Sequence, residues 1–93
     1  MKYAVVTGAS SGMGLEFARQ LAERKYGIVI VSNQLEENRR VAEMLRRQNQ
    51  VDVRVIDMDL TLPKAAEDIY QQVTSWELEV EVLVSNAGML LFS

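Results

Sequence analysis

Three glycines lie close together near the start of the chain, in the segment from Thr7 to Gly14. The segment follows a short apolar run that predicts a buried strand, and it opens a run with helical spacing. Between a strand and a helix, such a turn is typical of phosphate binding. The unpaired N–H groups at the N-terminus of the helix and the positive end of its dipole both attract an anion there. Gly8 permits the tight turn, Gly12 lets the main chain approach a pyrophosphate, and Gly14 lets the helix lie close to the sheet. The segment predicts a pyrophosphate site, although a sharp structural turn alone would also use these glycines.

Small and polar residues end two later strands as well. The segment Ser85-Asn86-Ala87-Gly88 follows the apolar run of residues 80–84, and Asp59-Leu60 follows the run of residues 51–56. Each of these residues has an alternative to a binding role. Asp59 could be a solvated carboxylate at a strand end, as Asp57 is expected to be, and Asn86 could serve only to form a turn.

Hydrophobic patterning predicts the elements that hold these loops. Strands are expected at 3–6, 28–31, 51–56 and 80–84, and helices at 12–26, 35–47 and 61–76. The continuous β-branched run at 28–31 indicates a strand covered on both faces, whereas alternation at 51–55 indicates an edge strand. The expected inner faces are Met13, Phe17 and Leu21 in the first helix, Leu35, Val41 and Leu45 in the second, and Ala66, Ile69, Val73 and Trp76 in the third.

Strands that alternate with helices require right-handed crossovers and give a parallel sheet. We therefore predict an α/β fold of the Rossmann type, with four strands in the order 3-2-1-4 and helices on both faces. The first and fourth strands are then neighbours, and a ligand crevice opens at their carboxyl ends.

The composition excludes several classes of function. The 93 residues contain no cysteine and no histidine, which removes thiol nucleophiles, imidazole bases and the commonest metal ligands, so no metal site is expected. A net charge of −3 with scattered basic residues argues against a nucleic-acid partner. No segment resembles a signal sequence or reaches membrane-spanning length, so a cytoplasmic protein without a membrane partner is expected. The loop lacks the Gly-Lys-Ser/Thr ending of a P-loop phosphotransferase.

Taken together, Thr-Gly-x-x-x-Gly-x-Gly at 7–14, Asp59 and Asn-Ala-Gly at 86–88 resemble the short-chain dehydrogenase/reductase family. The resemblance spans all 93 residues but only the front part of a typical member, so the chain is expected to be a partial, truncated NAD(P)-binding domain. It implies that the glycine loop lines the cofactor, that Asp59 and the Leu60 main chain meet adenine, and that residues 86–88 flank a ribose. It also implies that Thr7 connects the glycine loop to the segment after residue 84. Ser85 replaces the first of two asparagines often found there. With the residues that end the second strand, the expected cofactor-binding set is Gly8, Ser10, Ser11, Gly12, Met13, Gly14, Ser32, Asn33, Asp59, Leu60, Asn86, Ala87 and Gly88.

The residues after the second strand distinguish NAD from NADP in such folds, because a carboxylate there binds a ribose 2′-hydroxyl and a cation accepts a 2′-phosphate. Ser32 and Asn33 stand at this point, and neither is charged. NADP is favoured over NAD, since nothing repels a 2′-phosphate, while Arg39 and Arg40 are expected to face water.

The resemblance implies hydride transfer between nicotinamide and a carbonyl or alcohol, with a tyrosine as acid/base and a lysine four residues later. None of the three tyrosines, Tyr3, Tyr26 and Tyr70, has a lysine at that spacing, so no catalytic residue is expected and the chain alone should be inactive. The alternative hypothesis is a stand-alone, non-catalytic module for nucleotide binding or self-assembly. We also expect homo-oligomers, formed through the strand edge at 80–84 or the apolar tail at 89–92.

Overall fold

The structure, a computed structural model, describes residues 1–9 and 12–85. Strands and helices alternate along the chain as the sequence predicts. The strands are β1 (Lys2–Thr7), β2 (Gly27–Ser32), β3 (Val53–Asp57) and β4 (Glu79–Ser85). The helices are α1 (Gly12–Glu23), α2 (Leu35–Asn49) and α3 (Ala65–Ser75).

The strands form one parallel sheet in the order β3-β2-β1-β4, which confirms the predicted topology. The central strand β1 pairs with β2 up to Thr7 opposite Val31, and with β4 up to Thr7 opposite Ser85. Every residue of β2 is buried, as its continuous β-branched sequence predicts for a strand covered on both faces. The strand expected at the edge, β3, does lie at the edge.

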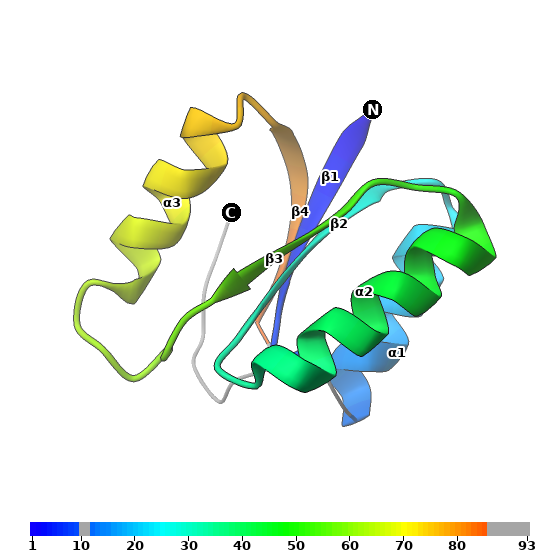
Figure 1. The fold of residues 1–93 in the computed structure, drawn as a ribbon. Helices are drawn as coiled ribbons and strands as arrows, with labels where there is room; N and C mark the ends of the chain where they lie inside the picture. Colours follow the sequence, from blue (N-terminus) through cyan, green and yellow to red (C-terminus); the bar gives the residue numbers. More distant parts are fainter. Residues whose placement is uncertain (10–11, 86–93) are drawn as a thin grey trace.

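Figure 1 shows α1 and α2 on one face of the sheet and α3 on the other. Alternate residues of β2 enter two separate apolar clusters, because successive side chains of a strand point to opposite faces. Ile28 and Ile30 pack with residues of α1 and α2, whereas Val29 and Val31 pack in the cluster beside α3. The fold is therefore the expected α/β arrangement with helices on both faces.

The inner face of α1 differs from the prediction. Met13 is 66% exposed and Phe17 is 40% exposed, although the hydrophobic spacing assigned both to the core. The buried residues are instead the small ones, Gly14, Ala18 and Ala22, and Leu21 is only partly buried. Small side chains allow the helix to lie close against the sheet, so the close contact itself displaces the large residues to the outside.

Element boundaries and two other inner faces also differ in detail. Helix α3 begins at Ala65, after Pro63, because residues 59–65 form two successive turns in which Leu62 N–H donates to the Asp59 carbonyl and Ala65 N–H to the Leu62 carbonyl. Ala65 is consequently buried where Ala66 was expected. In α2, Val41 and Leu45 are buried as predicted, but Leu35 is 38% exposed at the first position of the helix.

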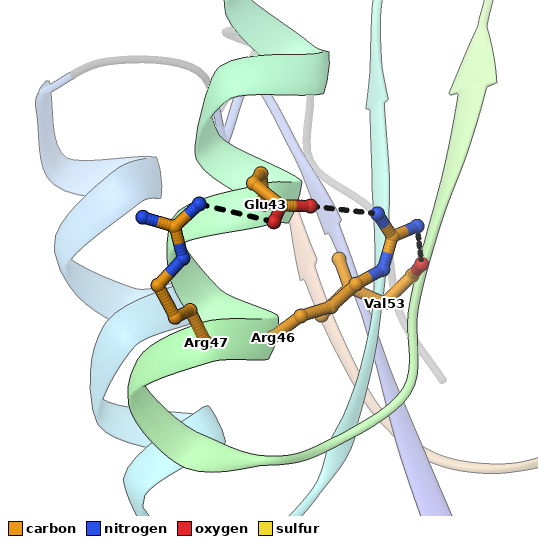
Figure 2. Close-up of polar contacts among 4 residues, drawn as sticks. All are labelled: Glu43, Arg46, Arg47 and Val53. Atoms are coloured by element: carbon orange, nitrogen blue, oxygen red, sulfur yellow. Dashed lines mark hydrogen bonds and ion pairs between the residues drawn. The ribbon is translucent and has the colours of Figure 1, made fainter.

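The charged side of α2 faces solvent, as predicted, and it also fixes the start of β3. Figure 2 shows the Arg46 guanidinium donating to the Val53 carbonyl, while Glu43 lies between Arg46 and Arg47. The two ion pairs measure 3.8 and 3.2 Å and are exposed, so each contributes about 0–1 kcal/mol at most. The contact to Val53 has the clearer structural role, since it joins the last turn of α2 to the following strand.

Gly27 provides a test of how closely β1 and β2 are packed. A Cβ atom at Gly27 would overlap ring carbons of Tyr3, and this ring is held by a 2.6 Å hydrogen bond from its hydroxyl to Asp52 Oδ2. We expect Gly27→Ala to lower the free energy of unfolding by about 1–3 kcal/mol, the usual cost of overpacking, as measured by urea denaturation. In a Tyr3→Val background, Gly27→Ala should lower the free energy of unfolding by clearly less. Equal costs in both backgrounds would contradict the steric explanation.

Candidate functional site

The glycine corner joins the end of β1 to the start of α1. Gly8 has a φ of 66° and Gly12 a φ of 62°, both in the left-handed region that glycine adopts without strain. Gly8 N–H donates to the Val31 carbonyl at 2.9 Å, which ties the corner to β2. Gly12 is exposed, and among residues 1–9 and 12–85 no atom outside its own stretch of chain lies within 4 Å of the place where its Cβ would stand. Ser10 and Ser11 lie outside the described residues.

The end of β4 lies directly beside this corner. Thr7 and Ser85 are partners in the parallel pairing, and the Thr7 hydroxyl donates to the Val84 carbonyl at 3.4 Å. The expected connection through Thr7 therefore runs to the last residues of β4. The two strands therefore end at the same level of the sheet. Asn86, Ala87 and Gly88 lie outside the described residues, so their own part in the site stays a prediction.

The turn after β2 contains a buried polar pair. The Ser32 side chain is buried and its hydroxyl donates to Asn38 Oδ1 at 2.6 Å, while Asn38 Nδ2 donates to the Ser32 carbonyl at 3.1 Å. Asn33, the next residue, is exposed. Arg39 and Arg40 are exposed as well, as expected, and Arg40 pairs with Glu37 at 3.4 Å. Sequence reasoning overlooked Asn38, although its spacing from Val41 and Leu45 assigns it to the buried face of α2.

The segment after β3 forms a turn that the carboxylate of Asp59 stabilises. Asp59 Oδ1 accepts from the Thr61 hydroxyl at 2.6 Å and from the Thr61 N–H at 2.9 Å. These two bonds hold the pKa of Asp59 below its usual value, so this residue is an anion at neutral pH. Leu60 is half-buried and packs against the apolar cluster beside α3. Asp57 is exposed, as predicted for a solvated strand end.

The strand pairing gathers the described candidates at one edge of the sheet. Gly8 follows β1, Asn33 follows β2, and Asp59 follows β3 by two residues, with Ser32 opposite Asp57 in the register. Parallel strands place all these carboxyl ends together, as Figure 1 lets the reader trace. Met13 and Gly14 belong to the same group because they form the first turn of α1. This is the crevice edge at which doubly wound folds bind ligands.

The tyrosines take no part in this edge. The Tyr3 hydroxyl donates to Asp52, and burial together with this bond raises the pKa of Tyr3. The Tyr26 hydroxyl donates to Glu81 Oε1 at 2.7 Å, and this bond raises the pKa of Tyr26. Tyr70 is 72% exposed on α3. Tyr3 and Tyr26 therefore form structural contacts at the amino end of the sheet.

An apolar groove of 430 Å³ lies between α3 and strands β1 and β4. Its lining includes Val5, Ile69, Val73 and Leu83.

Within residues 1–9 and 12–85, no three His, Cys, Asp or Glu side chains are grouped as metal ligands. Among the same residues, none of the helices has both the length and the apolar character needed to cross a bilayer.

Residues 2–93 match a family model described as short chain dehydrogenase. The chain belongs to the short-chain dehydrogenase family. Two relatives in this family have similar sequences throughout the chain. The very-long-chain 3-oxoacyl-CoA reductase of Macaca fascicularis is 34% identical over 90 residues, which are 95% of this chain and 28% of the relative. The 17-beta-hydroxysteroid dehydrogenase type 3 of Homo sapiens is 34% identical over 89 residues, which are 96% of this chain and 28% of the relative. The chain thus spans little more than a quarter of the length of these short-chain dehydrogenases.

Solved structures of short-chain dehydrogenases share the fold. The alcohol dehydrogenase of the archaeon Thermococcus sibiricus, complexed with 5-hydroxy-NADP, matches all of this chain and 40% of its own, with a TM-score of 0.87 and 31% identity. The L-sorbose reductase of Gluconobacter frateurii, complexed with NADPH and L-sorbose, matches 95% of this chain and 34% of its own, with a TM-score of 0.87 and 33% identity. These similarities confirm the expected family and Rossmann-type fold. The substrates named for these proteins differ, while both structures carry a nicotinamide dinucleotide phosphate or its derivative.

Proposed function

We propose that this chain is the nucleotide-binding portion of an NADP(H)-dependent short-chain oxidoreductase. In this proposal residues 1–93 form a partial NAD(P)-binding domain, and the whole enzyme transfers hydride between nicotinamide and a carbonyl or alcohol. The observation that carries the proposal is the pairing of Thr7 in β1 with Ser85 in β4. This pairing sets the glycine corner beside the carboxyl end of β4, the end of a parallel sheet at which ligands of such folds bind.

The glycine corner suits a pyrophosphate group. None of the described residues outside its own stretch of chain fills the space beside Gly12, which would let a phosphate oxygen approach the main chain at the start of α1. A helix leaves its first N–H groups without partners inside the helix and carries about half a positive charge at this end. Gly8 supplies the turn, and the buried Gly14 keeps the first turn of α1 close to the sheet. Met13 contributes to the same first turn.

The remaining roles come from the family resemblance. Ser10 and Ser11 would add donors to the phosphates, and Asn86, Ala87 and Gly88 would flank a ribose. Asp59 and the Leu60 main chain would meet the adenine. In support, the carboxylate of Asp59 is charged and only half-buried. Both of its hydrogen bonds go to Oδ1, so among the described residues Oδ2 has no hydrogen-bond partner.

Three observations favour NADP(H) over NAD(H). The Thermococcus sibiricus and Gluconobacter frateurii structures contain 5-hydroxy-NADP and NADPH. The residues that end and follow β2, Ser32, Asn33 and Gln34, include no acidic side chain that would repel a 2′-phosphate. Asn33 is exposed, so its amide can donate to a phosphate oxygen.

Bound NADPH would supply the hydride, and the residues of this chain would bind and orient it. The tyrosine and lysine that the family resemblance assigns to proton transfer do not occur at the required spacing in these 93 residues. We therefore propose that this chain binds the dinucleotide without turning over a substrate.

The substitution Gly12→Val tests the proposed site. A β-branched side chain at a φ of 62° is strained, and its methyl groups would occupy the space proposed for the pyrophosphate. We expect this variant to raise the dissociation constants of NADPH and NADH by a factor of about 100 or more, which corresponds to the loss of two or more charge-assisted hydrogen bonds. Binding is measured by titration with nicotinamide fluorescence.

The matched control is Lys25→Val, because Lys25 has a φ of 70° and lies beyond the opposite end of α1. This variant places the same β-branched side chain at a left-handed position away from the glycine corner, and it should bind both dinucleotides like the unaltered chain. Unchanged binding by Gly12→Val, or an equal loss in both variants, would remove the site assignment.

We also propose that copies of this chain associate through the β4 edge or the tail at residues 89–92, which lies outside the described residues. In support, β1 is the one strand that β4 pairs with in the part of the chain that the structure describes, Val80 is 38% exposed, and the apolar groove lies beside the same strand. A strand edge with unpaired main-chain groups is a template for pairing.

Light scattering after gel filtration measures this association. We expect a mass of at least two chains, reduced by Val80→Lys because a charge at the edge opposes pairing, but unaffected by Leu62→Lys, an exposed apolar residue away from β4. A monomer at all concentrations would contradict the proposal. Association without any dinucleotide binding would favour the alternative, a stand-alone assembly module.

A further inference from the structure

A polar side chain lies inside the layer between the sheet and α2. Asn38 is 0% exposed and stands on the helix face that otherwise buries Val41, Ala42 and Leu45. An amide among apolar groups costs free energy unless its donor and acceptor are both used. Asn38 uses both on a single residue, Ser32, at the end of β2.

These bonds fix the main chain on both sides of Asn33. Before it, the Ser32 carbonyl accepts from Asn38 Nδ2 at 3.1 Å and from Met58 N–H at 3.0 Å. After it, Gln34 N–H donates to the Ser32 hydroxyl oxygen at 3.2 Å, and that same hydroxyl donates its proton to Asn38 Oδ1. The peptide groups that flank Asn33 are therefore held in place, and with them the direction in which its side chain leaves the backbone.

The same bonds restrict what Ser32 itself can do. Its hydroxyl proton is committed to Asn38, and the residue is only 7% exposed. The exposed side chain of Asn33 is consequently the better placed of the two to meet a ribose 2′ substituent, at the strand end where such folds distinguish the two dinucleotides.

We propose that Asn38 is a positioning residue that makes the site distinguish NADPH from NADH, acting through Ser32 on Asn33. Ser32 shapes the turn and leaves direct contact with the 2′-phosphate to Asn33. This inference rests on the proposed function, since it concerns the adenosine end of the same dinucleotide site.

The test compares the dissociation constants of NADPH and NADH for the unaltered chain, Asn38→Leu, Asn33→Ala and the double variant. We expect each single substitution to reduce the ratio of the NADH to the NADPH constant by about 10-fold, the value of one hydrogen bond to a charged group. The double variant should show the ratio of Asn33→Ala alone, because residues that act through one another are not additive. Leu45→Val, on the same buried face of α2, should lower stability and leave the ratio unchanged.

Circular dichroism during heating identifies any variant that does not fold. If Asn38→Leu does not fold, Ser32→Ala replaces it, since that change deletes one hydroxyl of the network and should lower the ratio in the same direction. Equal weakening of both dinucleotides by Asn38→Leu, or an unchanged ratio, would overturn the inference while the proposed function stands. An additive double variant would also overturn it, because Asn38 would then not act through Asn33. An unaltered chain that binds neither dinucleotide would overturn both proposals together.

Discussion

The position of the candidate site depends on the register of the central strand. Thr7 of β1 stands opposite Val31 on one side and Ser85 on the other, so three strands end at nearly the same level. Main-chain hydrogen bonds maintain this register, and burial on both faces keeps it from shifting, because a slip of one residue would turn every side chain to the other face. The pairing of these strands therefore fixes the points at which the loops with the candidate residues begin.

The close packing of α1 then aims the first turn of that helix at the crevice. Gly14, Ala18 and Ala22 are all buried, and their small side chains let the helix lie near the sheet. With a bulkier inner face the helix would stand farther out, and the N–H groups at Gly12 and Met13 would move with it. The exposure of Met13 and Phe17 follows from this arrangement, since large side chains do not fit in so narrow a space.

The strands and their order could be predicted from the sequence, because continuous runs such as residues 28–31 have one stable environment, a parallel sheet covered on both faces. The inner face of α1 could not, since hydrophobicity counts Met13 as a core residue and takes no account of the distance between helix and sheet. Asn38 was missed for a related reason: its spacing indicates burial, but only the position of Ser32 shows which partners satisfy its amide. The start of α3 shifted because Asp59 and Thr61 form a local turn that competes with the helix beginning at Pro63.

Amide NMR of the chain during titration with NADPH tests most directly whether the carboxyl edge of the sheet is the dinucleotide site. We expect the largest shift changes at Gly8, Gly12, Met13, Gly14 and Asn33, and no change at Tyr26 and Glu81, which lie at the amino end of the sheet. Changes centred on Tyr26 and Glu81, or on the groove residues Ile69 and Val73 beside α3, with the glycine corner unaffected, would contradict it.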